Sequence, residues 1–384
     1  MVFGAGEPKE MSLKLRCDAC QALARYAPDG AFEQVTVADW MPGYDGEGPG
    51  NIYGWGLAAF PDGSSCLALW LECPFVIPSQ SGEIALVPEP EGVSDGFLVR
   101  FDPQGLARWA RRIGGAGEDG AWGVEALPDG SCVVAGWYEN AATVEGGGAA
   151  DVTLDAGEPF GQYAARYGVD GGLDWAIDLD IRQPQEGMGP DGPAKPLVLK
   201  NGDLAVAGQF AGKIDLGDGQ IAEGTENLPQ IYLSRLSATG QKHWAAAAVG
   251  PGHRGDVESG ARDIAELADG SLVVGGTVNG EKTFGAGEPA ETTLVSDGRE
   301  DGFLAMYEPD GKLVWAFRLG GESVWGATDG VVAVAAVGND TIYAAGFFAG
   351  TPTIGDSPAQ SMGISTSGGT EVLLMRLDRN KPPR

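Results

Sequence analysis

The chain has 384 residues, including 63 glycines, 24 prolines and ten tryptophans, and hydrophobic residues make up 43% of it. Its 54 acidic and 25 basic residues give a formal net charge of −29, which would repel nucleic-acid phosphates and anionic lipid surfaces. No run of 18 or more apolar residues occurs, so the sequence offers no candidate transmembrane helix. Composition therefore argues against nucleic-acid binding and a membrane span, and favours a large apolar core with frequent turns.

A short alternating segment recurs six times along the chain. In its second copy Phe97, Val99 and Phe101 alternate with Leu98 and Arg100, which is typical of a half-buried strand. We call this segment strand A, and successive copies lie 66 to 75 residues apart. The four residues that end each copy are 23–26, 98–101, 164–167, 233–236, 304–307 and 374–377.

A tight turn that ends in glycine follows each of the first five copies of strand A. Glycine adopts positive φ without strain, as such turns require. These glycines are Gly30, Gly105, Gly171, Gly240 and Gly311. The turn leads into a strand B, which carries a tryptophan four residues later at Trp109, Trp175, Trp244 and Trp315, whereas the first copy has Gln34. A tryptophan that recurs at one strand position indicates packing between repeats rather than a ligand platform.

A second turn separates strands C and D in every repeat. Its residues are 61–63, 128–130, 200–202, 268–270 and 338–340. Strand D then ends near a recurring glycine, such as Gly136, that would leave room for a neighbouring backbone. Four antiparallel strands in each of several repeats are typical of a propeller blade.

We therefore expect an all-β fold: a β-propeller of about five four-stranded blades, forming one domain over residues 1–384, with closure of the ring left open. The repeats run approximately over 22–96, 97–162, 163–231, 232–302 and 303–371, with a partial sixth over 372–384. A β-solenoid is the alternative. We disfavour it because solenoid coils are usually shorter than about 70 residues.

The five cysteines leave at least one thiol without a partner inside the chain. Cys17 and Cys20 form one C-x-x-C pair, but a zinc site needs about four ligands and no second pair exists, so we expect no metal there. Cys66 and Cys132 follow the same turn in successive repeats, which favours small core residues. The sequence does not fix the disulfide state of these four cysteines or of Cys73.

The repeat resembles the bacterial SBBP repeat, a family named for a seven-bladed β-propeller. The resemblance rests on Phe97–Gly105, Trp109–Gly115, Gly123-Val124 and Pro128–Gly136, and again on Phe303–Gly320. It covers essentially the whole chain and implies a secreted or surface-attached bacterial scaffold. It carries over no catalytic residue. The first and third repeats have lost several consensus positions, and five repeats are fewer than the family name implies.

The two ends of the chain are out of phase with the repeat. Residues 3–8 match residues 284–289, and both segments lie 23 residues before the tyrosine of their strand A, Tyr26 or Tyr307. The chain thus starts and stops inside a repeat, and both ends supply the same segment to a ring. We expect a secreted or cell-surface protein whose export signal lies upstream of residue 1.

The B–C connections vary in length and lie on the face opposite the tight turns, where function usually resides. They carry the candidate binding residues Trp40, Asp45, Trp55, Glu118, Asp119, Trp122, Glu186, Asp191, Asp256, Glu258, Glu322 and Trp325. Acids and indoles on one rim can bind sugars or cations, but they equally suit turn capping and packing.

These residues favour a non-catalytic scaffold that binds a protein or carbohydrate partner. No G-x-S-x-G, H-E-x-x-H or P-loop occurs, so we assign no catalytic residue. A propeller-type hydrolase or lyase that acts on polysaccharide through a carboxylate pair remains the alternative. We expect no cofactor; Ca²⁺ is the one ion considered, because the loop acids could supply its six to eight oxygen ligands.

Overall fold

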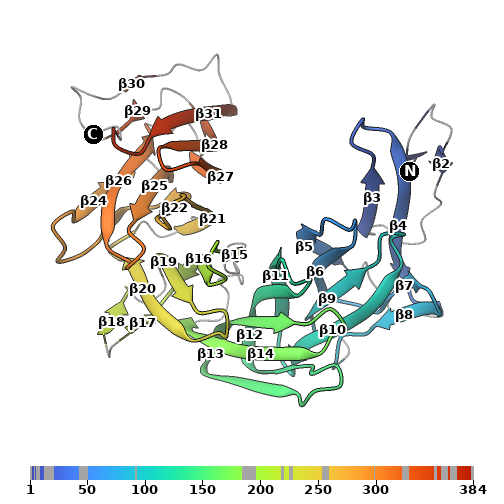
Figure 1. Ribbon diagram of the computed structural model, residues 1–384. Helices are drawn as coiled ribbons and strands as arrows, with labels where there is room; N and C mark the ends of the chain where they lie inside the picture. The colour runs from blue at the N-terminus through green and yellow to red at the C-terminus, as the bar shows by residue number, and fades with distance from the viewer. Residues whose placement is uncertain are drawn as a thin grey trace. The chain divides into compact units, whose positions relative to one another are not determined.

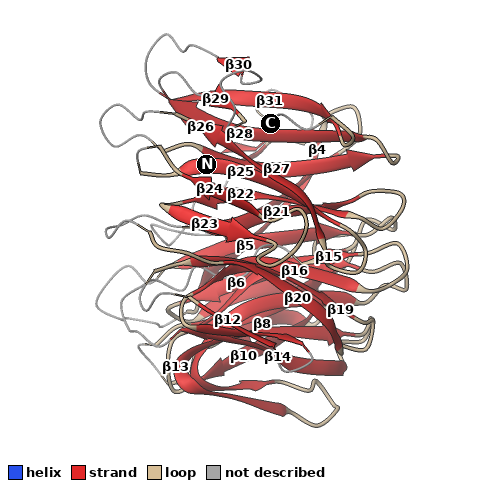
Figure 2. Cartoon of the chain, turned by 90° about the vertical axis from the view of Figure 1, so that its left-hand side faces the viewer, coloured by secondary structure: helices blue, strands red, loops and turns tan. Residues whose placement is uncertain are grey.

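The computed structural model describes residues 2–3, 5, 9–12, 21–42, 51–90, 93–183, 196–217, 220–224, 228–252, 259–297, 299–321, 328–349, 353–355, 362–363 and 370–381. These residues form strands, turns and loops without a helix, which confirms the all-β expectation (Figure 2). The described part of the chain accordingly contains no helix long and apolar enough to cross a membrane.

All four predicted strand types occur along the chain (Figure 1). The A strands are β3 (Gln21–Tyr26), β9 (Asp95–Phe101), β13 (Val152–Tyr167), β19 (Gln230–Leu236), β25 (Asp301–Tyr307) and β31 (Thr370–Asp378). The B strands are β4 (Phe32–Trp40), β10 (Ala107–Gly115), β14 (Leu173–Gln183), β20 (Lys242–Ala248) and β26 (Leu313–Gly320). The C strands are β5 (Ile52–Ala59), β11 (Asp119–Ala126), β15 (Leu197–Val198), β21 (Gly260–Glu266) and β27 (Gly330–Val337). The D strands are β6 (Ser65–Leu71), β12 (Cys132–Val144), β16 (Leu204–Phe210), β22 (Leu272–Val278) and β28 (Thr341–Ala349).

The remaining strands are short. They are β1 (Val2–Phe3), β2 (Met11–Ser12), β7 (Phe75–Ser79), β8 (Gly82–Leu86), β17 (Lys213–Gly217), β18 (Gln220–Glu223), β23 (Glu281–Phe284), β24 (Thr292–Val295), β29 (Thr353–Ile354) and β30 (Met362–Gly363).

The chain divides into two compact units. The first comprises residues 1–157 and 161–179, and the second comprises residues 158–160 and 180–384. In the first unit the strands pair in the orders β5-β6-β9-β10 and β11-β12-β13-β14, after an initial β3-β4 pair. In the second unit the orders are β15-β16-β19-β20, β21-β22-β25-β26 and β27-β28-β31.

Each sheet therefore runs in the order C-D-A-B, so that strand D of one repeat pairs with strand A of the next. Cys66 on β6 lies opposite Arg100 on β9, for example, and Val273 on β22 lies opposite Met306 on β25. Counting the repeats from strand A, as the sequence analysis does, cuts every sheet between strands D and A.

The predicted tight turns have the expected backbone. The glycines that end the A–B turns have φ values of 70° to 89°, and Gly63, Gly130, Gly202 and Gly270 in the C–D turns have φ values of 84° to 89°. Gly105 shows why: its N–H donates to the carbonyl oxygen of Asp102, and this closed turn places residue 105 in the left-handed region. Because both turn types join neighbouring antiparallel strands, they leave the same edge of each sheet.

The D–A connections contain short hairpins that the sequence analysis did not predict. In the first unit β7 and β8 form such a hairpin, and β7 pairs with strand B of the preceding sheet, where Phe75 lies opposite Trp40. In the second unit β17 and β18 form another, and Ile214 lies opposite Ile181 of β14. The β7–β8 hairpin joins neighbouring sheets of the first unit through backbone hydrogen bonds.

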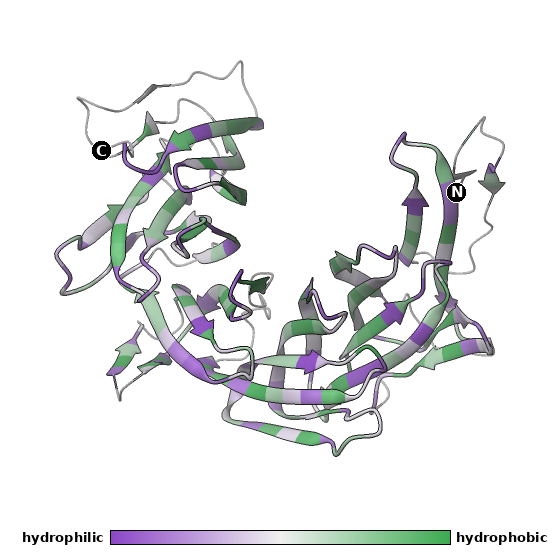
Figure 3. Cartoon of the chain, viewed as in Figure 1, coloured by the Kyte–Doolittle hydropathy of each residue, from purple (hydrophilic) through white to green (hydrophobic). Residues whose placement is uncertain are grey.

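Apolar cores fill the spaces between neighbouring sheets within each unit. Hydrophobic and hydrophilic stretches follow one another along the strands (Figure 3), and the buried hydrophobic side chains form these cores. The recurring tryptophans of strand B contribute, which confirms the prediction of a packing role: the Trp109 indole N–H donates to the Val169 carbonyl oxygen at 3.0 Å. Trp244 makes the same bond, at 3.1 Å, to Pro309 in the A–B turn that follows it, and Trp315 makes it, also at 3.1 Å, to Arg379 just after β31.

Candidate binding site

Seven of the twelve candidate binding residues lie outside the described residues: Asp45, Glu186, Asp191, Asp256, Glu258, Glu322 and Trp325. The structure places the other five in the first unit, but only Glu118 lies in a loop, where it is exposed. The expectation of loop positions is wrong for Trp40, Trp55, Trp122 and Asp119. These residues lie in strands because β4, β5 and β11 extend further than the turn residues suggested.

Two of these candidates stack on each other. The rings of Trp55 on β5 and Trp122 on β11 lie with centroids 4.2 Å apart and planes 13° from parallel. Trp55 also lies against Tyr53 at 5.8 Å, and Tyr53 lies against Trp70 on β6 at 4.9 Å, both nearly parallel. Trp137 on β12 meets the Trp70 ring edge-on, with the two ring centroids 6.3 Å apart. We call these five residues the aromatic column.

The exposure of the column changes along its length. Trp137 is buried, Trp70, Tyr53 and Trp122 are partly buried, and Trp55 is 48% exposed. The buried end holds the column in a fixed position, while the Trp55 end meets solvent. A large exposed indole fixed in this way is a candidate contact for a ligand.

A bulge in strand C sets the position of each of the two stacked indoles. The β5–β6 register shifts between Gly54 and Gly56, on either side of Trp55, and the β11–β12 register shifts around Trp122. A bulge inserts one residue and redirects its side chain. Gly56 has a second role, since a Cβ there would lie 2.8 Å from the Trp122 carbonyl oxygen, and the absence of a side chain lets β11 approach β5.

The corresponding bulges in the second unit carry other residues. The register of β21 shifts around Arg262, and that of β27 shifts around Val332. The paired indoles are therefore a feature of the first two C strands and not of every C strand.

Asp119 is buried, and both of its carboxylate oxygens accept backbone hydrogen bonds. Oδ1 accepts from the Glu139 N–H at 3.0 Å, and Oδ2 accepts from the Gly115 N–H at 2.5 Å. Burial raises the pKa of Asp119 to about 8. Asp329 in the second unit accepts in the same way from Ala349 and Gly321. In each unit the carboxylate joins strand D to the end of strand B, so its role is structural.

A second buried carboxylate lies near each of these two. Asp95 binds the Arg112 guanidinium at 2.5 Å in the first unit, and Asp301 binds Arg318 at the same distance in the second. Burial raises the pKa of both carboxyls, that of Asp301 to about 6. Raised pKa values are typical of catalytic acids, but these side chains have no exposed surface through which a substrate could reach them.

Tyr53, Trp70 and Trp137 were not predicted as candidates, although a signal for them exists in the sequence. Trp70 and Trp137 occupy the same position of strand D in successive repeats, and Tyr53 precedes Trp55 by two residues, which puts both on one face of the strand. Aromatic residues two apart on one strand and repeated on the next indicate a stack across strands.

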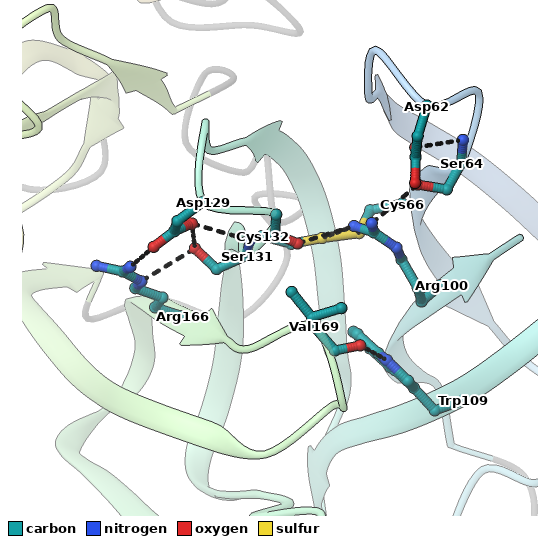
Figure 4. Close-up of a disulfide and its surroundings, with 11 residues drawn as sticks. Asp62, Ser64, Cys66, Arg100, Trp109, Asp129, Ser131, Cys132, Arg166 and Val169 are labelled. Carbon is teal, nitrogen blue, oxygen red and sulfur yellow. Dashed lines mark hydrogen bonds and ion pairs between the residues drawn. A yellow bond between two sulfur atoms is a disulfide. The ribbon is translucent and has the colours of Figure 1, made fainter.

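Cys66 and Cys132 are buried in the core, as expected, and they form a disulfide between β6 and β12 that was not predicted (Figure 4). Cys66 follows its turn glycine by three residues and Cys132 follows its own by two. Successive residues of a strand face opposite sides, so the two thiols point toward each other from neighbouring sheets. Cys17 and Cys20 lie outside the described residues, and Cys73 is buried and unpaired.

A buried arginine lies beside this disulfide. The Arg100 guanidinium lies 3.5 Å from both sulfur atoms and donates to Ser64 Oγ at 2.9 Å (Figure 4). It also lies 3.6 Å from the centre of the Phe60 ring. Burial lowers the pKa of Arg100. This interface between two sheets is crosslinked and polar at one point, whereas its surroundings are apolar.

Within the described ranges, no group of three or more His, Cys, Asp or Glu side chains is arranged to hold a metal ion. No protein-family model matches the chain, and no curated protein has a sequence similar to it.

Proposed function

We propose that this chain is a non-catalytic binding scaffold and that the aromatic column of the first unit is its ligand contact. The observation that carries this proposal is the position of Trp55, which is stacked on Trp122 and about half exposed. Folding already holds this indole in one position. The side chain therefore loses little further conformational entropy when a ligand covers it.

Carbohydrate is the ligand class that the column favours. The apolar face of a sugar ring packs on an indole, and the ring hydroxyls accept the indole N–H or bind nearby polar groups. The net charge of −29 disfavours anionic polymers, which leaves neutral or cationic glycans. A protein is the alternative ligand, and the binding experiment described below distinguishes the two ligand classes.

The buried carboxylates support a scaffold over a polysaccharide hydrolase. A glycosidase needs an acid and a second carboxylate on either side of an accessible bond. Asp119 and Asp329 use both oxygens on backbone N–H groups, and Asp95 and Asp301 are bound to arginines. Their recurrence in two units favours a structural role that each sheet needs.

We further propose that the C-D-A-B sheets are blades of a β-propeller of the SBBP type, with about five blades. Support comes from the period of the sequence and from the regular order of strands in each unit. We also propose a secreted or cell-surface location. The Cys66–Cys132 disulfide supports it, because disulfides persist in oxidising compartments.

A glycan array probed with the full chain tests the function. We expect retention on a set of neutral or amino glycans, at least about tenfold weaker for Trp55→Ala and for Trp122→Ala. Ile221→Ala removes an exposed apolar side chain from β18 in the other unit and serves as the matched control. Unchanged retention in both tryptophan variants, or release of shortened glycan by the wild type, contradicts the proposal. Binding to a protein array alone would mean that the aromatic column contacts a protein and not a glycan.

A further inference from the structure

The Cys66–Cys132 disulfide lies against a buried cation. Arg100 on β9 is 2% exposed, and its Nη1 lies 3.5 Å from each of the two sulfur atoms (Figure 4). Nη1 also donates to the Gly130 carbonyl oxygen at 3.2 Å, and Nη2 donates to Ser64 Oγ at 2.9 Å. Nε is buried and has no hydrogen-bond partner among the described residues. Because a disulfide sulfur is neutral and accepts hydrogen bonds weakly, the oxidised pair compensates this guanidinium poorly.

Other A strands carry an arginine at the same position, and there a carboxylate compensates it. These ion pairs are Arg25–Glu33, Arg166–Asp129 and Arg235–Asp203. Arg100 forms no ion pair with a carboxylate of the described residues. Where the other repeats supply a carboxylate, this one supplies two sulfur atoms, and a thiolate is the negative charge that a cysteine can provide.

The charged groups around the sulfurs are engaged with other partners. Asp62 accepts from the Ser64 hydroxyl at 2.5 Å, and Asp129 binds Arg166. Burial lowers the pKa of the guanidinium beside the sulfurs, and the charge of Arg108 on β10 lowers it further, whereas Asp62 raises it. Three cations and two carboxylates thus surround the pair, and an excess of positive charge favours a thiolate over a thiol.

We propose that Cys66 and Cys132 form a reversible redox site and that Arg100 holds one of their sulfurs as a thiolate in the reduced state. The reductant is a dithiol. One of its sulfurs attacks the pair and forms a mixed disulfide, and its second sulfur then displaces the protein sulfur and closes a cyclic disulfide. Two electrons pass from the dithiol to the pair. Of the two protons that the dithiol gives up, one goes to a cysteine sulfur and the other to solvent, because the second cysteine sulfur stays a thiolate.

The position of the pair allows this exchange without unfolding of the core. Both sulfurs are buried, but Cys66 lies four residues after Asp62 and Cys132 lies three residues after Asp129. Both aspartates are exposed in their C–D turns. Opening of these turns exposes the sulfurs at a lower cost in free energy than global unfolding. We therefore expect slow but reversible exchange in the folded chain.

The same two sheets also carry the aromatic column. The disulfide joins β6 to β12, and the stacked indoles of Trp55 and Trp122 join β5 to β11 of the same sheets. Reduction removes the covalent link between the sheets, so we expect it to loosen this stack and to weaken ligand retention. This expectation about retention rests on the proposed function, whereas the redox site itself does not.

Equilibration of the full chain with mixtures of reduced and oxidised dithiothreitol, between pH 6 and pH 8, tests the redox site. Acid quenching, alkylation and peptide mapping give the fraction of the Cys66–Cys132 pair that is reduced. Free thiols stay largely protonated below about pH 8, so the proton released to solvent should raise the equilibrium constant for reduction about tenfold per pH unit. A reduced pair that holds two ordinary thiols releases no proton, and its constant would not change with pH.

Arg100→Met should abolish this dependence on pH. Arg166→Met is the matched control, because it removes a guanidinium bound to Asp129 and Ser131 in one of the two turns, and it should keep the wild-type slope. Circular dichroism checks that each variant is folded. A wild-type constant that does not change with pH overturns the proposal even if Arg100→Met fails to fold. An equal slope in Arg100→Met, or a pair that stays oxidised at every ratio of the reagents, also overturns it.

Glycan retention by the oxidised and the reduced chain tests the link to the aromatic column separately. Weaker retention after reduction supports the link. Equal retention refutes the link, and the redox titration stands or falls without it.

Discussion

The indole N–H of Trp109 on β10 donates to the carbonyl oxygen of Val169, sixty residues later in the A–B turn of the next repeat, at 3.0 Å. This bond joins the outer strand of one sheet to the turn of its neighbour. In the first repeat Gln34 stands at the tryptophan position, and its amide donates to Pro103 in the corresponding turn at 3.4 Å. The repeat therefore keeps the hydrogen bond even where it loses the ring.

Replacement of Trp109 by phenylalanine separates the bond from the packing. Trp109→Phe leaves the Val169 carbonyl without its donor and should lower the free energy of unfolding by about 1 to 2 kcal/mol. Trp109→Ala also removes a buried ring and should lower it by about 3 to 5 kcal/mol. Urea unfolding of both variants measures this difference. A Trp109→Phe variant as stable as the wild type would mean that the hydrogen bond contributes nothing, and equal losses in the two variants would mean that the ring contributes nothing.

Removal of the disulfide should destabilise the first unit. Cys66→Ala combined with Cys132→Ala releases a crosslink that spans 66 residues of sequence, and should lower the free energy of unfolding by about 2 to 5 kcal/mol. Differential scanning calorimetry with and without reductant provides the measurement. Cys73→Ala is the control for loss of a buried thiol; a reductant effect of equal size in the double variant would contradict the assignment.

Asp119 should make stability depend on pH. Its pKa is raised to about 8 in the folded state, so its contribution is fully present below the ordinary aspartate pKa and is lost as the pH rises through 8. The stability advantage of the wild type over Asp119→Asn should therefore shrink between about pH 4 and pH 8 and then stay constant. For Asp301→Asn the same decline should end near pH 6. Chemical unfolding at several pH values measures both; an advantage that grows with pH reverses the sign and refutes the assignment.

Lys282 should act in the opposite direction. Its buried ammonium donates to the carbonyl oxygens of Gly250, Pro251 and Asn279 at 3.1 to 3.2 Å, and burial lowers its pKa to about 8. The folded state thus disfavours the charged form, and stability should rise from about pH 8 toward the ordinary lysine pKa near 10.5. Lys282→Met should flatten this rise and, near neutral pH, leave three carbonyls unsatisfied. If the stability of Lys282→Met rises with pH as that of the wild type does, another titrating group causes the rise.

Calcium should not stabilise the chain. Of the loop acids considered as ligands, Asp119 uses both oxygens on backbone N–H groups and is unavailable to a cation. We expect the thermal midpoint to agree within about 1 °C in millimolar Ca²⁺ and in EDTA, since a site that is filled at that concentration would raise it. A rise of several degrees would place a Ca²⁺ site in the acidic loops.

The sequence predicted features that are local or periodic. Turns such as the one closed by Gly105, the four strand types and the packing role of Trp109 follow from spacing and residue type alone. It did not predict the hairpin of β7 and β8, because strands of five residues around a glycine or proline resemble a loop. It also missed the Cys66–Cys132 disulfide. The two cysteines look equivalent because each follows the C–D turn, but their distances from the turn glycine differ by one residue, and this difference decides which face of the strand each thiol lies on.

The candidate site was predicted only in part, for a related reason. Trp55 and Trp122 were chosen as candidates from the sequence, but their mutual stacking depends on bulges and on the close approach at Gly56. A bulge leaves little trace in a single sequence. The loop acids were chosen by charge, and Asp119 shows that a carboxylate among polar residues can be wholly occupied with backbone groups.

The half-repeat offset between sequence and sheet decides which segment could be cut out or transplanted. A segment from one strand A to the next, such as residues 97–162, would carry two strand pairs whose natural partners have been left behind. Residues 119–183 begin with β11 and end with β14, and so hold one whole sheet. A gene duplication or a designed insertion with these boundaries would add a complete sheet in one step, and the sequence period alone would not reveal where to cut.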